Sequence, residues 1–222
     1  MSLRWGVVRF PGSCDEVDAL GACARFGEAE LLWHGDRDLK GVDAVVVPGG
    51  FSYGDHLRVG AIARFSPVME AVADFIAEGG PVLGICNGFQ VLCEAGHLPG
   101  ALLPNTSLRF VCRQVDLTVE SAATPWTARC AEGDVLRVPV KHTTGRWWAP
   151  PRLLAEVEER GGVVLRYAPG HNPNGSLSDV AAVASTGGNV LGLMPHPEHA
   201  VDPLSGSTDG ALLFSSLAAV PA

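Results

Sequence analysis

Positive charge is scarce in this sequence. The 222 residues include only 16 lysines and arginines against 24 aspartates and glutamates, which gives a formal net charge of −8. The cations are scattered along the chain rather than gathered in basic patches. Because nucleic acids and anionic membrane surfaces are bound through such patches, the sequence predicts neither kind of partner.

Long apolar runs are missing as well. Residues 1–4 lead directly into the short run 5–8, with neither the long apolar core nor the cleavage site of an export signal. No apolar stretch approaches the ~20 residues that a membrane-spanning helix needs. We therefore expect a soluble, cytoplasmic protein.

The six cysteines form no recognisable framework. None of them shows CxxC spacing, and none lies with histidines at the spacing of zinc ligands. In a chain of this length they do not indicate a disulfide scaffold. We expect no metal site, and we expect most cysteines to be reduced and packed as small hydrophobic residues.

Apolar strands alternate with helical segments in the first half of the chain. The runs 5–10, 42–47 and 81–85 are mostly apolar, as is typical of parallel strands that are buried on both faces. Segments 15–26 and 61–78 have the apolar spacing of helices and lie between them. This alternation predicts an α/β fold with a mostly parallel central sheet flanked by helices.

The pattern changes in the second half. Strand-like segments 108–120 and 135–140 follow one another with little helix between them, and 180–185 with 189–193 predicts a hairpin. We therefore expect an antiparallel extension of the sheet. No repeat and no long linker interrupts the sequence, so we expect residues 1–222 to form a single domain.

The stretch "GICNGFQVL", residues 84–92, places Cys86 where an apolar strand meets the start of a helix. A helix N-terminus presents unpaired N–H groups and a partial positive charge, which stabilise a thiolate. Gly84 and Gly88 leave room for a tight turn and for a substrate. The alternative is that Cys86 is a core cysteine that packs near Cys93.

A second motif is "MPHPE", residues 194–198. In extended backbone, residues two apart point to the same side, so His196 and Glu198 are expected to project together. The flanking prolines stiffen the segment. A histidine base oriented by a carboxylate is half of a nucleophilic triad, whereas the motif taken alone is also compatible with a surface loop.

The third motif is "PGG", residues 48–50, at the end of a predicted strand. Its glycines can expose backbone N–H groups, and the N–H groups of Gly50 and Asn87 would form an oxyanion hole. Loss of one such donor raises a reaction barrier by about 2.7–4 kcal/mol. An ordinary strand-to-helix turn is the alternative. Because ligands bind beyond the carboxyl ends of parallel strands, we expect the three motifs to share one site.

Together these motifs resemble class I glutamine amidotransferases, which have a flavodoxin-like fold. The longer segments 48–67, 83–105 and 188–201 resemble, more narrowly, the family of glutaminase subunits of phosphoribosylformylglycinamidine synthase. The resemblance implies that Cys86 attacks the side-chain amide of L-glutamine while His196 transfers the proton and Glu198 orients His196. Ammonia leaves, and water then hydrolyses the thioester to glutamate.

The resemblance also implies further contacts with glutamine. Gln90 is similar to a residue that binds the substrate, and the backbone around Lys141 and His142 is expected to receive the amino-acid end. Family members usually have a small residue where Lys141 stands and an arginine where His199 stands. These departures leave the triad intact.

A phosphate-binding loop of the GxxxxGK[ST] type is not found in this sequence. The resemblance implies no cofactor in this chain, and it places ATP and magnesium on a separate synthetase subunit. That subunit would use the ammonia to convert formylglycinamide ribonucleotide in purine synthesis, together with a small accessory subunit.

Two other functions remain open at this point. Cysteine hydrolases and deglycases of flavodoxin-like fold also carry a cysteine at such a corner, but a histidine usually follows it directly, where this chain has Asn87. A non-catalytic binding module with an inert Cys86 is the other alternative.

Overall fold

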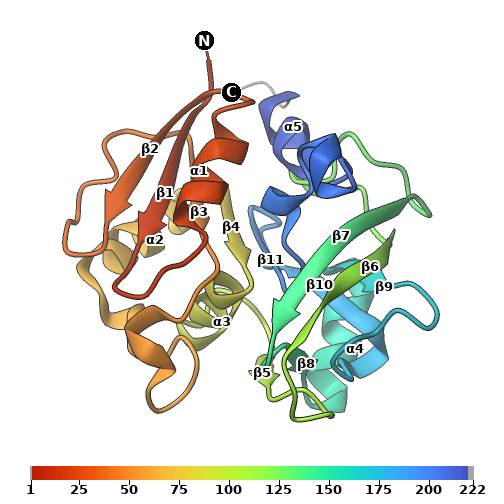
Figure 1. The fold of residues 1–222 in the computed structure, drawn as a ribbon. Coiled ribbons are helices and arrows are strands. Elements are labelled where there is room, and N and C mark those ends of the chain that lie inside the picture. The colour runs from red at the N-terminus through yellow and green to blue at the C-terminus, as the bar shows by residue number, and fades with distance from the viewer. Residues whose placement is uncertain (1, 220–222) are drawn as a thin grey trace.

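A nine-stranded sheet dominates the computed structural model, which describes residues 2–219 (Figure 1). Its strands are β1 (Arg4–Arg9), β2 (Glu28–Trp33), β3 (Ala44–Val47), β4 (Val82–Ile85), β6 (Val111–Val119), β7 (Val135–His142), β9 (Val163–Tyr167), β10 (Val180–Ala184) and β11 (Val190–Leu193). Across the sheet their order is β2-β1-β3-β4-β11-β10-β9-β6-β7. A separate antiparallel pair consists of β5 (Ala101–Leu103) and β8 (Arg146–Trp148).

Strands β2, β1, β3, β4 and β11 are parallel, as the alternating pattern predicted. All residues of β3 and β4 are buried, which explains their continuously apolar sequences. Strand β11 comes from the far end of the chain and pairs with β4, so that Leu193 lies opposite Ile85. The residues that follow these two strands therefore emerge together at one edge of the sheet.

Strands β10, β9, β6 and β7 form the antiparallel extension, seen in the right half of Figure 1. The predicted hairpin joins β10 to β11. In β7 the burial alternates along much of the strand, as expected for an antiparallel strand with one face on the core.

In the described part of the chain, five α-helices flank the sheet: α1 (Glu16–Cys23), α2 (Pro67–Ala77), α3 (Asn87–Glu94), α4 (Pro151–Glu159) and α5 (Ala211–Ala219). Helix α1 packs on β1 and β2 and contacts α5, whereas α3 packs on β3, β4 and β11. In Figure 1, α1 lies in front of the parallel strands, and α2 and α3 lie behind them. Within residues 2–219, no helix combines the length and the apolar character needed to cross a bilayer.

Helix α2 is shorter than the sequence predicted. We expected a helix over 61–78, but it begins at Pro67, and a short 3-10 helix, Ala63–Phe65, precedes it. Ser66 between them is extended, with φ −66° and ψ 142°. A proline disfavours the helical conformation in the residue before it, which explains the break.

Gly88 marks a close approach between α3 and β3. A Cβ atom at this position would lie 1.8 Å from the carbonyl oxygen of Val47. The glycine therefore permits the packing of a helix on a strand, whereas the sequence had associated it with room for substrate.

We expect the substitution Gly88→Ala to lower the free energy of unfolding by about 1–3 kcal/mol or more, because the added methyl group must push α3 away from β3. Urea denaturation measures the change. Gly21→Ala in α1 is the matched control, since a Cβ there meets no described atom within 4 Å. That control should be neutral or up to about 1 kcal/mol more stable. Equal stability of the two variants would contradict the packing argument.

Candidate active site

Cys86 lies at the corner between β4 and α3, at the position that caps the helix. Its φ of 51° and ψ of −103° are strained for a residue other than glycine. Such strain costs about 1–3 kcal/mol and is typically found at functional sites. The N–H group of Cys86 donates to the carbonyl of Leu193 in β11 at 2.8 Å, which fixes the corner against the neighbouring strand.

His196 and Glu198 follow β11 and lie in contact with each other. The His196 Nδ1 and Glu198 Oε1 atoms are 2.6 Å apart, and both side chains are buried. Pro197, Glu198 and His199 form a 3-10 turn rather than the extended backbone that the sequence predicted. The two side chains meet because the turn folds back, and the N–H group of His196 is held by the carbonyl of Pro139 in β7 at 2.8 Å.

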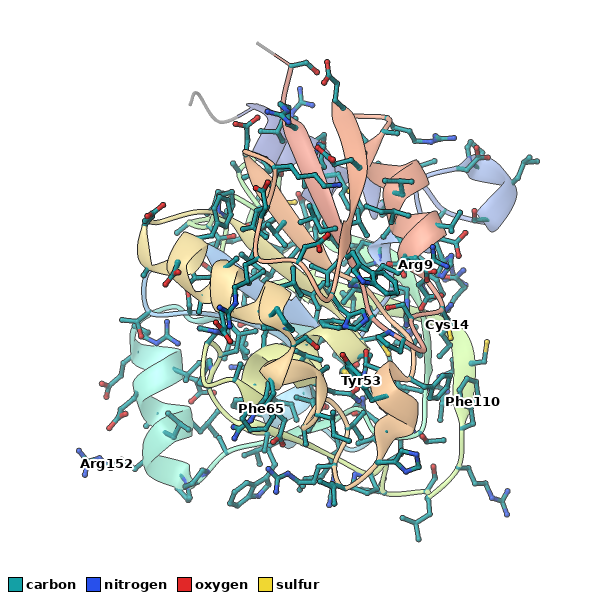
Figure 2. The ribbon with its side chains drawn as sticks, turned by 90° about the vertical axis from the view of Figure 1, so that its left-hand side faces the viewer. Arg9, Cys14, Tyr53, Phe65, Phe110 and Arg152 are labelled. Carbon is teal, nitrogen blue, oxygen red and sulfur yellow. The ribbon has the colours of Figure 1, made fainter. Side chains whose placement is uncertain are left out.

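Cys86 and His196 line the same pocket, which has a volume of about 80 Å³. Cys14 and Phe110 also line it and lie on the same side of the molecule (Figure 2). Because Glu198 occupies Nδ1 of His196, the other ring nitrogen, Nε2, is left with no hydrogen-bond partner among residues 2–219. This nitrogen is available for a proton from the thiol.

The charges around His196 favour its protonated form. Burial by itself would lower the pKa of the imidazole, but the negative charges of Glu198 and of a Cys86 thiolate outweigh burial and raise the pKa to about 10. A protonated His196 can therefore stabilise a thiolate at Cys86 in this pocket.

The backbone N–H groups expected to form the oxyanion hole come from Gly50 and Asn87. Gly50 lines the pocket and forms an isolated bridge with Ser13. The flanking hydrogen bonds run from Cys14 N–H to the Gly49 carbonyl at 3.2 Å and from Phe51 N–H to the Gly12 carbonyl at 2.8 Å. In the described part of the chain, the Gly50 N–H itself has no acceptor. It is available to a ligand.

The side chain of Asn87 ties the loop after β3 to α3. Its Oδ1 accepts from the N–H and the hydroxyl of Ser52, and its Nδ2 donates to Gln90 Oε1 at 2.9 Å. Gln90 in turn donates to the carbonyl of Thr144. Gln90 lines the pocket as expected, but both ends of its amide are engaged by the protein in this structure.

His142 lies at the end of β7 and is buried. Burial, together with the positive charge of His196, lowers the pKa of His142 to about 4, so its ring is neutral near pH 7. Its Nε2 lies 3.0 Å from Nδ2 of Asn174, which also donates to the carbonyl of Gly145 at 2.8 Å. The backbone carbonyl of Lys141 lies 3.9 Å from the Cys86 sulfur.

Two further segments, 172–176 and 206–210, support the site. Asn174 holds the loop that follows His142. At Gly210 the chain passes so close to the 3-10 turn Pro197–His199 that a Cβ on Gly210 would lie 2.2 Å from the Pro197 carbonyl oxygen. Both segments hold parts of the chain that carry pocket residues.

Asp15 is a site residue that the sequence did not reveal. Its Oδ1 bonds the ammonium of Lys141 and lies 3.5 Å from Nε2 of His199, so the two departures from the family pattern converge on one carboxylate. Asp15, His196, Glu198 and His199 place potential metal-donor atoms within 4.8 Å of one another. Because Lys141 and His196 already bond the two carboxylates, we assign the cluster to hydrogen bonding within the pocket.

A thiolate beside a protonated imidazole can attack a carbonyl carbon and then protonate a departing amine, which is the chemistry of amide hydrolysis. In this sheet Cys86 follows β4 and His196 follows the neighbouring strand β11. This arrangement, combined with amide hydrolysis, is typical of class I glutamine amidotransferases.

Comparison with known proteins agrees with this class. The model of the CobB/CobQ-like glutamine amidotransferase domain matches residues 3–210. The chain is 61% identical over 218 residues to the phosphoribosylformylglycinamidine synthase subunit PurQ of Rubrobacter xylanophilus, covering 98% of each chain. It is 57% identical over 223 residues to PurQ of Mycobacterium tuberculosis, covering 99% of each.

A solved structure is similar over the same length. A chain in the structure of PurLQS from Thermotoga maritima shares 41% sequence identity with a TM-score of 0.90, and the match covers 98% of both chains. The chain described here therefore belongs to the PurQ family of glutamine amidotransferases. The family and the α/β fold class predicted from the sequence are confirmed, and the hydrolase or deglycase alternative is not favoured.

We expect Asn174→Ala to raise the KM for glutamine, because it frees the loop around His142 that lines the pocket. It should also lower the free energy of unfolding by about 1–3 kcal/mol, since buried polar partners are left unsatisfied. Asn189→Ala is the control: Asn189 makes comparable bonds to the carbonyls of Ile76 and Gly80, away from the pocket. Steady-state kinetics should show a changed KM in the first variant only. The same KM in both would contradict a role for Asn174 in shaping the pocket.

Proposed function

We propose that this chain, acting as one catalytic domain, is the glutaminase subunit of a phosphoribosylformylglycinamidine synthase. It hydrolyses glutamine to glutamate and ammonia with Cys86 as nucleophile, His196 as acid and base, and Glu198 as the carboxylate that orients His196. The observation that carries this proposal is the pocket lined by both the strained Cys86 and His196, with the buried Glu198 bonded to the His196 ring.

The first half of the reaction forms a thioester. The Cys86 sulfur attacks the side-chain amide carbon of glutamine, and the thiol proton passes to Nε2 of His196. The imidazolium then gives this proton to the amide nitrogen, the carbon–nitrogen bond breaks, and ammonia leaves. Glu198 stabilises the imidazolium throughout, since it accepts a hydrogen bond from Nδ1 at 2.6 Å.

The second half restores the enzyme. His196 takes a proton from water, whose oxygen attacks the thioester carbon, and the proton returns to the sulfur as glutamate is released. In both halves the negative charge on the substrate oxygen is stabilised by the N–H groups of Gly50 and Asn87. The position of Gly50 on the pocket wall and its unused N–H support this assignment.

The amino-acid end of glutamine is held by the wall formed by Gln90, Lys141 and His142. All three line the pocket with Cys86. The neutral ring of His142 does not place a second positive charge beside His196, so His142 contributes to this wall through hydrogen bonds of its ring and backbone. For Gln90 to bind the substrate, its amide must exchange a protein partner for glutamine.

The ammonia is delivered to a synthetase subunit, which uses ATP and magnesium to convert formylglycinamide ribonucleotide, with a small accessory subunit in the same assembly. The similarity to PurQ subunits and to a chain of PurLQS supports such an assembly. Ammonia that escaped into water at neutral pH would be protonated and no longer nucleophilic, so transfer within the complex is favoured.

Cys86→Ser in the assembled synthase should lower glutamine-dependent turnover by at least about 10³-fold, because the thiolate nucleophile is lost. Turnover with added ammonium salt should be retained, since the synthetase is intact. Cys112→Ser removes an exposed thiol and serves as the control with unchanged turnover. Glutamine hydrolysis retained in the Cys86 variant would rule out its assignment as nucleophile.

We expect the chain alone to hydrolyse glutamine weakly and the rate to rise when the synthetase is added. The measurement is the rate of glutamate release at saturating glutamine, with and without the synthetase subunit. Full activity of the isolated chain would argue against coupling between the subunits.

A further inference from the structure

Asp15 occupies a position where aspartate usually has a simple structural role. It is the residue that caps the N-terminus of α1, where an aspartate side chain normally accepts a hydrogen bond from the first turn. Within residues 2–219, the Asp15 carboxylate makes no such bond to the helix. The side chain is only 5% exposed and lines the catalytic pocket instead. Capping therefore does not explain why the carboxylate is buried here.

The carboxylate is held against the catalytic histidine across Gly49. The backbone N–H of Asp15 donates to the carbonyl of Gly49 at 3.3 Å. A Cβ atom on Gly49 would lie 2.3 Å from Oδ2 of Asp15 and 2.9 Å from Cε1 of His196, so only a glycine lets the two groups approach. Oδ2 lies 3.7 Å from Nδ1 of His196, the nitrogen that also bonds Glu198.

The other carboxylate oxygen faces positive and polar groups. Oδ1 bonds the ammonium of Lys141 and lies 3.5 Å from Nε2 of His199. Burial opposes ionisation of Asp15, but His199, Lys141 and His196 together hold the pKa of its carboxyl well below the usual range. Asp15 is therefore a buried negative charge with one oxygen neutralised by a lysine and the other facing the catalytic base.

The titratable groups around His196 come from four parts of the chain. They are Cys86 after β4, Asp15 before α1, Lys141 and His142 in β7, and Glu198 and His199 in the turn after β11. Glu198 and Asp15 contribute carboxylates beside the same ring nitrogen. Two uncompensated carboxylates would hold the imidazolium proton too firmly for easy transfer to the departing amide nitrogen, whereas Lys141 offsets one of them.

We propose that Asp15 is a positioning residue of the glutaminase, a second carboxylate beside Nδ1 of His196, and that its ion pair with Lys141 sets how strongly it stabilises the imidazolium. The proposal rests on the role of His196 proposed above. Asp15 favours the protonated imidazole while the thioester forms. Lys141 limits that effect, so that the proton can still pass to the departing nitrogen.

The test is the pH dependence of kcat/KM for glutamine hydrolysis in the assembled synthase, for Asp15→Asn, Lys141→Met and the double variant. The high-pH limb reports loss of the proton that His196 must donate. Asp15→Asn removes a negative charge from beside the imidazolium, so this limb should move to lower pH by about one to three units.

Lys141→Met should move the same limb to higher pH, because Asp15 is still ionised at alkaline pH and its charge is no longer offset. The double variant should lie between the two single variants. Glu16→Gln is the matched control at the start of α1, since Glu16 pairs with Arg9 at 3.3 Å rather than with the pocket. Its profile should coincide with that of the unmodified protein.

A purely structural role predicts a different result, namely lower activity in the variants without opposite shifts of the limb. The proposal would be overturned if the high-pH limbs of both single variants coincided with that of the unmodified protein. It would also be overturned if both limbs moved in the same direction. If Asp15→Asn fails to fold, Lys141→Met alone decides through the upward shift. These outcomes are separate from a failure of Cys86 as nucleophile, which would appear as glutamine hydrolysis retained in Cys86→Ser.

Discussion

The pairing of β4 with β11 is the constraint on which the catalytic site depends. Leu193 lies opposite Ile85, and the N–H of Cys86 donates to the Leu193 carbonyl at 2.8 Å. Two parallel strands from distant parts of the chain therefore end side by side, and the residues that follow them share one pocket. The backbone sets this arrangement, and the side chains at the ends of the strands supply the chemistry.

Burial gives the few charges in this pocket their strength. His196 and Glu198 are buried away from water, and their attraction is therefore only weakly screened. As a result, the pKa of the imidazole lies far above its usual value. The same burial requires that each charge has a partner. Asp15 is paired with Lys141 in that environment, and the pair joins the start of α1 to the end of β7.

The sequence predicted the parallel core and the positions of Cys86, His196 and Glu198, because apolar runs and short motifs are local signals. It missed Asp15, whose partner Lys141 lies 126 residues away, since such a contact leaves no local pattern. Asn174 was missed for the same reason. The three-residue strands of the β5–β8 pair are too short to show periodicity. The helix predicted over 61–78 was wrong in its first part, because the helix begins only at Pro67. The apolar spacing suggested a longer helix, but a proline disfavours the helical conformation in the residue before it.

The central claim is that the sulfur of Cys86, among all six cysteines, is the activated nucleophile. The most direct measurement is mass-spectrometric mapping of the protein after brief exposure to a chloroketone analogue of glutamine. The account predicts one saturable modification, located on Cys86 and prevented by excess glutamine. First modification of Cys14, which lines the same pocket, or a Cys86 that resists the reagent while glutamine is being hydrolysed, would contradict it.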